Sequence, residues 1–154
     1  MAWQKLTLAI PKDLDPAQRA QLADLITEHI VDRTQRGIDK NGNAFPKYSK
    51  EYIKSLDFKN AGKSAGRVDL QLSGDMLAAL GLISSRNGQI IIGFQNGSRE
   101  NDIAEGNILG SYGRSPNSSK ARDFLGIDQI KLRELIDNVK LTSANQDQTD
   151  NSED

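Results

Sequence analysis

The stretch GIDKNGNAFPKYS, residues 37–49, contains the side chains best suited to binding a metal ion. Asp39, Asn41 and Asn43 occupy the first, third and fifth positions of a calcium-binding loop. Such a loop needs a glycine at its sixth position and a bidentate glutamate at its twelfth. This chain has an alanine at the sixth and Lys50 at the twelfth. The spacing therefore predicts a β-turn around Asn41 rather than a calcium site.

Nucleophilic and nucleotide chemistry lack the residues that they normally need. The chain has no cysteine, a single histidine, His29, and no Gly-x-Ser-x-Gly turn to present a serine. His29 lies on or beside an apolar helical stripe, which predicts a partly buried structural role. Gly62-Lys63-Ser64 matches the end of a phosphate-binding loop, but Asp57 stands where the first glycine is required. We therefore expect no catalytic residues, no metal, no cofactor and no enzymatic activity.

One enzymatic alternative stays open on the sequence. A small nuclease or another soluble enzyme could hold a divalent metal through carboxylates alone, using Asp39, Glu100, Asp102 and Glu105. This interpretation requires side chains from separate parts of the sequence to converge in the fold.

Basic residues are concentrated between Lys40 and Arg67, where seven lysines and arginines are opposed only by Glu51 and Asp57. Aromatic residues are interleaved with them. Such a surface can contact phosphates without reading bases, although an ordinary solvated face explains the pattern equally well. The candidates for a DNA-facing surface are Lys47, Lys50, Lys54, Lys59, Lys63 and Arg67.

The elements that must position these residues follow from capping signals and periodicity. Asp15, Pro16 and Gln18 form a capping box with proline at the first helical position, which predicts a helix from Pro16 to about Gln35. Asn87-Gly88 between two β-rich segments predicts a hairpin. We also expect a strand within residues 3–10, a short helix after residue 49, a strand over 68–72, a short helix over 76–80, a strand over 121–125, and a helix from about 128 to 141.

The mixture of helices and hairpins predicts an α+β fold with a mainly antiparallel sheet, packed with a long N-terminal helix and a C-terminal helix. The 154 residues suffice for one domain, which we place at residues 1–141. We expect an arm over about 37–68 and a long polar loop over about 95–122, because the latter is rich in Gly, Ser and Asn. The last residues carry four acids and no base, which predicts a flexible, disordered acidic tail over 142–154.

Composition limits the possible partners. The 20 basic and 21 acidic residues give a net charge of −1, and leaving out the four acids of the tail gives +3. Such a weak excess allows passing contact with nucleic acid but does not indicate a dedicated DNA binder. No apolar run is long enough to span a bilayer, and the N-terminal residues do not resemble a signal peptide, so we expect no membrane association.

Four segments in order resemble the virion-morphogenesis, or tail-completion, proteins of tailed phages. They are RTQRGIDKNGNAFPKYSKEYIKSLDF (33–58), VDLQLSGDMLAAL (68–80), IIIGF (90–94) and RDFLGID (122–128). One departure is the absence of a histidine from residues 95–120, where the family often has one. The matching positions are Arg33, Gly37, Asp39, Gly42, Phe45, Pro46, Tyr48, Ser49, Leu72, Ser73, Gly74, Met76, Leu77, Gly93, Phe124, Leu125 and Gly126.

The resemblance implies a structural role at the head–tail junction of a virion. A member of this family would be a tail terminator, tail-completion or neck subunit that forms a ring, expected to be a hexamer, around the DNA channel. Its partners would be further copies of itself, the tail tube and the head connector or head-closure proteins, with non-specific contact to phage DNA. It would be found in the virion after assembly in the cytoplasm of the host bacterium.

Large apolar side chains beside the predicted turn must be buried, either in their own domain or in a neighbouring subunit. In a ring, we interpret them as a docking arm that fixes the lysine-rich helix that follows. Phe45→Ala or Tyr48→Ala is then expected to impair assembly more than monomer folding. The residues assigned to this arm are Ile38, Phe45, Pro46, Tyr48 and Tyr52.

Overall fold

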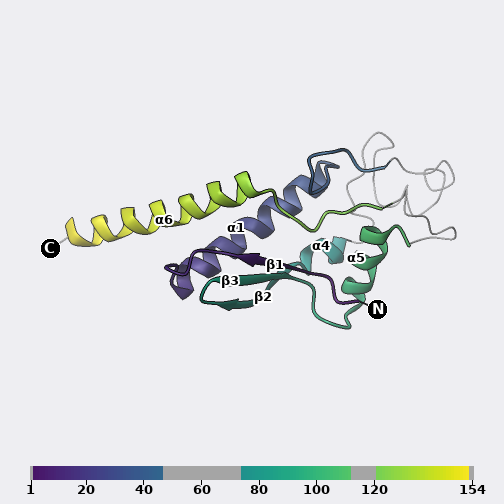
Figure 1. Ribbon diagram of the computed structural model, residues 1–154, viewed down its shortest axis with the longest axis horizontal. Helices are drawn as coiled ribbons and strands as arrows, with labels where there is room; N and C mark the ends of the chain where they lie inside the picture. Colours follow the sequence, from purple (N-terminus) through teal and green to yellow (C-terminus); the bar gives the residue numbers. More distant parts are fainter. Residues whose placement is uncertain (1, 47–73, 112–120, 153–154) are drawn as a thin grey trace.

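The computed structural model describes residues 2–46, 74–111 and 121–152 (Figure 1). Its described strands form one antiparallel sheet in the order β1-β3-β2, so the predicted α+β class and antiparallel sheet are confirmed. The elements in chain order are β1 (Lys5–Ala9), α1 (Pro16–Gln35), α4 (Gly74–Ala78), β2 (Gly81–Arg86), β3 (Gln89–Gly93), α5 (Arg99–Leu109) and α6 (Gln129–Ser152). The expected short helix after residue 49 and the expected strand over 68–72 lie outside the described residues.

The helix α1 begins at a capping box and carries the central part of the core. The Asp15 carboxylate accepts a hydrogen bond from the Gln18 backbone N–H at 2.8 Å, and the Gln18 side chain accepts one from the Asp15 N–H at 2.9 Å. Leu22, Ile26 and Ile30 recur at helical spacing and are fully buried. The helix ends before Gly37, whose φ of 78° is a conformation that glycine adopts at little cost.

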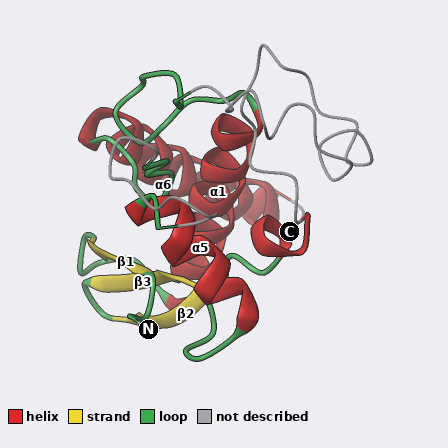
Figure 2. Cartoon of the chain, turned by 90° about the vertical axis from the view of Figure 1, so that its right-hand side faces the viewer, coloured by secondary structure: helices red, strands yellow, loops and turns green. Residues whose placement is uncertain are grey.

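The hairpin predicted at Asn87-Gly88 is present as β2 and β3, and β1 pairs with the other edge of β3. Leu8 lies opposite Ile90 in this register, and both side chains are buried. Figure 2 shows α1 and α6 on one side of the strands and α5 beside them. The core therefore fills the space between one face of the sheet and α1, and the same core includes Val139 of α6.

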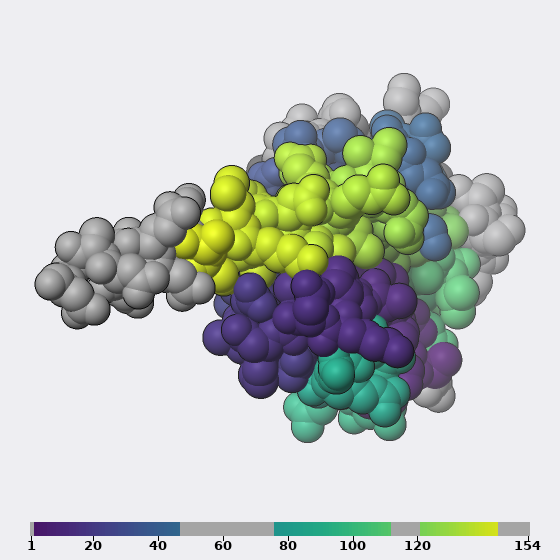
Figure 3. Space-filling view, turned by 60° about the vertical axis from the view of Figure 1, so that its left-hand side comes forward, coloured from purple at the N-terminus to yellow at the C-terminus, as the bar shows by residue number. Residues whose placement is uncertain are grey.

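The helix α6 packs on α1 on the side away from the sheet (Figure 1). Figure 3 shows it lying against the N-terminal part of the chain, where Lys140 pairs with Asp13 at 3.2 Å. Its bounds differ from the expected ones, because it continues through residues 142–152 instead of ending near Leu141 in a flexible tail. Those residues contain no glycine or proline to stop a helix, and extending an existing helix requires no new nucleation.

Residues 95–122 are not one long loop, because Arg99–Leu109 form the helix α5. The Ser98 side chain caps its start by accepting a hydrogen bond from the Asn101 N–H, and Gly110 ends it with a φ of 73°. The buried Asn101 side chain accepts from the Gln4 N–H at 2.7 Å and donates to the Ala2 carbonyl at 3.0 Å. These bonds fix the N-terminal segment to α5.

The strand expected over residues 121–125 is not formed: these residues have no regular secondary structure and do not pair with the described sheet. None of the helices in the described residues is both long enough and apolar enough to cross a membrane.

Candidate functional site

The predicted β-turn is present at residues 39–42, where the sequence partly matches a calcium-binding loop. The Asp39 carbonyl accepts a hydrogen bond from the Gly42 N–H at 3.1 Å, and Gly42 has a φ of 88°. One oxygen of the Asp39 carboxylate accepts from the N–H groups of both Asn41 and Asn43 at 2.9 Å. The carboxylate therefore stabilises its own turn, which is the usual role of an aspartate at this position.

Arg33 connects the end of α1 to the segment that precedes α6. Its guanidinium donates to the Phe124 carbonyl at 2.5 Å and to the Gly126 carbonyl at 2.9 Å, and the residue is only 6% exposed. Burial lowers the pKa of Arg33, while the neighbouring carboxylates of Asp39 and Asp128 act in the opposite direction. An arginine side chain stays charged in proteins, so Arg33 brings a buried positive charge to these carbonyl groups.

Lys40 and Asp123 join the same two parts of the chain from outside the core. Their side chains form an ion pair at 2.8 Å, and the Lys40 N–H donates to the Asp123 carbonyl at 3.1 Å. A side chain at Gly126 would lie only 2.7 Å from the Lys40 side chain. The turn over 37–45 and the segment over 122–126 therefore form one unit, which we call the arm base.

The contacts of the arm base fix the positions of three predicted docking residues, Ile38, Phe45 and Pro46. Ile38 bridges to Ala44, and the Phe45 N–H donates to the Gly37 carbonyl at 2.9 Å, so the chain folds back on the end of α1. This places Phe45 in the core of its own chain at 5% exposure, where its ring is not available to a neighbour. Ile38 and Pro46 stay half-buried at the surface.

The remaining predicted site residues lie outside the described residues. They are the docking candidates Tyr48 and Tyr52 and the basic candidates Lys47, Lys50, Lys54, Lys59, Lys63 and Arg67.

The carboxylates required by the nuclease interpretation do not converge. Asp39 is part of the arm base, whereas Glu100, Asp102 and Glu105 lie on α5. Across residues 2–46, 74–111 and 121–152, no three histidine, aspartate or glutamate side chains are grouped so that they could hold a metal ion. His29 is half-buried on α1, and burial followed by the charge of Arg33 lowers its pKa.

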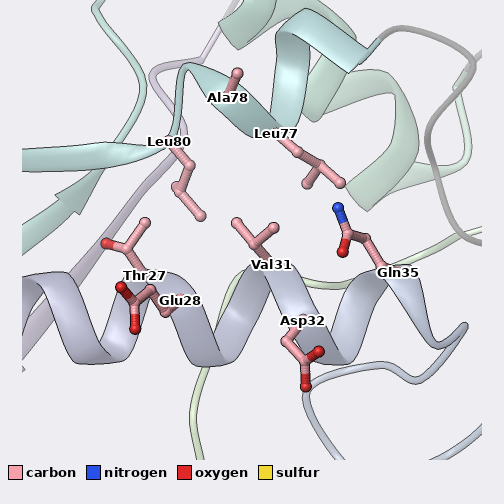
Figure 4. A pocket seen from close by; sticks show the side chains of 8 residues that line it. All are labelled: Thr27, Glu28, Val31, Asp32, Gln35, Leu77, Ala78 and Leu80. Atoms are coloured by element: carbon pink, nitrogen blue, oxygen red, sulfur yellow. The ribbon is translucent and has the colours of Figure 1, made fainter.

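A shallow groove of about 530 Å³ runs between α1 and α4 and was not anticipated from the sequence. Its apolar lining comes from Val31 of α1, from Leu77 of α4 and from Leu80, which follows α4 (Figure 4). Glu28 and Asp32 also line the groove from α1, and Figure 4 shows the Asp32 carboxylate turned away from α4. The only sequence signal for this second face of α1 was the helical spacing of Thr27, Val31 and Gln35.

Comparison with known proteins identifies no relative, because no protein-family model, no curated protein and no solved structure matches the chain.

Proposed function

We propose that this chain is a structural subunit of the head–tail junction of a tailed phage. In this proposal it is a tail terminator, tail-completion or neck subunit and has no enzymatic activity. It forms a homohexameric ring around the DNA channel and joins the tail tube to the head connector. It is a component of the virion, assembled in the cytoplasm of the host bacterium.

The observation that carries this proposal is the contact between motif segments far apart in the sequence. Arg33 belongs to the first segment, and the carbonyls that it binds belong to Phe124 and Gly126 of the last. Gly126 is also constrained, because Lys40 occupies the space that a side chain would need. This contact supports the proposal, because it joins the first and the last of the four segments in one structural unit.

The surface of the described residues also supports a role in assembly. Ile130 and Leu141 are large apolar residues of α6 that are mostly exposed, and the half-buried Pro46 leads from the arm base into the lysine-rich residues. Isolated exposed apolar residues are common, but a ring subunit needs several contact points for neighbours above, below and beside it. The net charge of +3 over residues 1–141 fits passing contact with DNA in a channel rather than sequence recognition.

The proposal is tested by the mass and shape of the purified protein. We expect light scattering after size-exclusion chromatography to give six times the subunit mass of 16.9 kDa, and electron microscopy to show rings. We also expect the chain in purified virions of the phage that encodes it. A protein that stays monomeric at high concentration and is absent from those virions contradicts the proposal.

A further inference from the structure

The groove between α1 and α4 has an apolar floor and an acidic rim. Val31, Leu77 and Leu80 form the floor. Glu28 and Asp32 both have exposed side chains on the part of α1 that lines the groove. The Asp32 carboxylate is turned away from α4 and forms an ion pair with the exposed Arg36 at 3.2 Å. A surface of this kind fits a ligand that carries a large apolar side chain flanked by positive charges.

The chain itself contains a segment with that complementary chemistry. Residues 47–67 contain six lysines and arginines against two acids, with Tyr48, Tyr52 and Phe58 interleaved. Tyrosine and phenylalanine supply large apolar area at a low entropy cost, and neighbouring lysines can pair with carboxylates at the rim. The chain therefore contains both the groove and a sequence segment whose charge and aromatic residues are complementary to it.

A ring is built from contacts between two different patches of identical subunits, since a head-to-tail contact closes when its rotation allows. We propose that the groove between α1 and α4 binds residues 47–67 of a neighbouring copy. This inference rests on the proposed ring and names its contact. The apolar floor and the aromatic side chains supply most of the affinity, because exposed ion pairs contribute only about 0–1 kcal/mol each. The charges at the rim orient the two copies.

Cysteine pairing tests the contact directly, because the chain has no cysteine of its own. One variant carries Glu28→Cys at the rim and a second carries Lys50→Cys in the segment. Mixing the two under mild oxidation is expected to give a disulfide-linked dimer that contains one copy of each. Each variant oxidised alone is the control, and a chain that carries both substitutions is expected to form a ladder of linked copies. If the doubly substituted chain forms a disulfide only within itself and no mixed dimer appears, the groove does not bind the segment of a neighbouring copy.

Charge reversal tests the same contact without cross-linking. Glu28→Lys is expected to weaken association about tenfold or more, since like charges placed opposite each other at an interface are strongly unfavourable. Adding Lys50→Glu to that variant should restore much of the loss. Asp24→Lys is the matched control, because Asp24 is an exposed acid of α1 that does not line the groove.

The outcomes separate this inference from the proposed function. Rings that form normally with Glu28→Lys, together with no mixed disulfide, overturn the groove contact and leave the ring proposal intact. A wild-type chain that never forms rings overturns both.

Discussion

The Arg33 guanidinium replaces a strand as the hydrogen-bond partner of the segment before α6. A strand was expected over residues 121–125, but the carbonyls of Phe124 and Gly126 accept from Arg33. Buried carbonyl groups must find donors, and a planar guanidinium can serve two of them at once. The apolar pattern of that segment reflects burial of Phe124 and Leu125 rather than pairing in a sheet.

Replacing Arg33 is therefore expected to destabilise the fold strongly. Arg33→Ala should lower the free energy of unfolding by about 3 kcal/mol or more, because hydrogen bonds to charged donors contribute roughly 1.5–3 kcal/mol each. Arg33→Lys should recover only part of this, since an ammonium cannot reproduce the fork geometry. Urea unfolding measures both variants. Arg36→Ala, in an exposed pair with Asp32, is the control, and an Arg33→Ala variant as stable as this control would show that the contact is unimportant.

Phe45→Ala is now expected to act on the monomer itself. The ring is buried in the core, and removal of a buried phenylalanine costs about 3–5 kcal/mol. This replaces the expectation that Phe45 would act mainly in assembly. Thermal unfolding of monomeric protein measures the effect. Ile130→Ala, at an apolar position 82% exposed, should change stability by less than about 0.5 kcal/mol. Equal effects of the two substitutions would contradict the core position of Phe45.

His29 should make stability depend on pH in a narrow range. Its folded-state pKa lies below the ordinary 6.5, because burial and then Arg33 disfavour the charged form. The unfolded chain therefore binds more protons, and stability falls as the pH drops through 6.5 towards the folded-state pKa. Above this range His29 is neutral in both states. Melting temperatures from about pH 7.5 to about pH 5.5 should fall less steeply for His29→Gln than for the natural chain. Parallel curves for the two proteins would contradict this origin.

At the scale of elements, two glycines that face each other across the hairpin differ in how much space surrounds them. Gly81 and Gly93 are partners in the register of β2 and β3. A side chain at Gly93 would lie 2.6 Å from the Gln4 carbonyl and 2.8 Å from Lys5 Cα, whereas one at Gly81 would meet nothing within 4 Å. The close approach of β1 to β3 therefore depends on Gly93 alone.

Alanine substitutions at these two positions make a matched pair. Gly93→Ala should destabilise the protein by about 1–3 kcal/mol, because backbone atoms of the segment that pairs with β3 must move. Gly81→Ala should be neutral or stabilising by about 0.4–1 kcal/mol, because it restricts the unfolded chain without a clash. Chemical unfolding measures the free energy of unfolding of both variants. Equal destabilisation would show that the strands need the flexibility of glycine at both positions rather than the close approach of β1 at Gly93.

Helix boundaries were predictable where local chemistry sets them and not elsewhere. The start of α1 is fixed by Asp15 and Gln18, which contact each other within four residues. The helix α5 packs Ile103, Ala104 and Ile108 on the core. Its buried face also includes Asn101, whose partners Ala2 and Gln4 are almost a hundred residues away. No local pattern could have revealed those bonds.

At the scale of the whole molecule, the described elements other than β2 all contribute residues to one core. Phe94, after β3, and Phe124, before α6, meet edge to face with their ring centres 6.2 Å apart. The same cluster contains residues from β1, α1, α4, α5 and α6. A continuous core of this kind predicts a single cooperative unfolding transition.

The single tryptophan provides the probe for this prediction. Trp3 donates a hydrogen bond to the Phe94 carbonyl at 2.5 Å, so its fluorescence reports on the sheet side of the core. Far-ultraviolet circular dichroism reports on the helices. The two signals should change at the same urea concentration, and separate midpoints would show that the helices and the sheet unfold independently.

The sequence by itself determined the features that depend on neighbouring residues. These are the cap of α1, the turn at Asp39, the Asn87-Gly88 hairpin and the absence of a complete calcium or phosphate loop. Only the tertiary structure decided that Phe45 is core, that Arg33 holds the segment over 122–126, and that α1 and α4 leave an acidic-rimmed groove. The physical reason is distance along the chain, because burial and hydrogen bonding between remote segments depend on how the chain packs rather than on any local pattern.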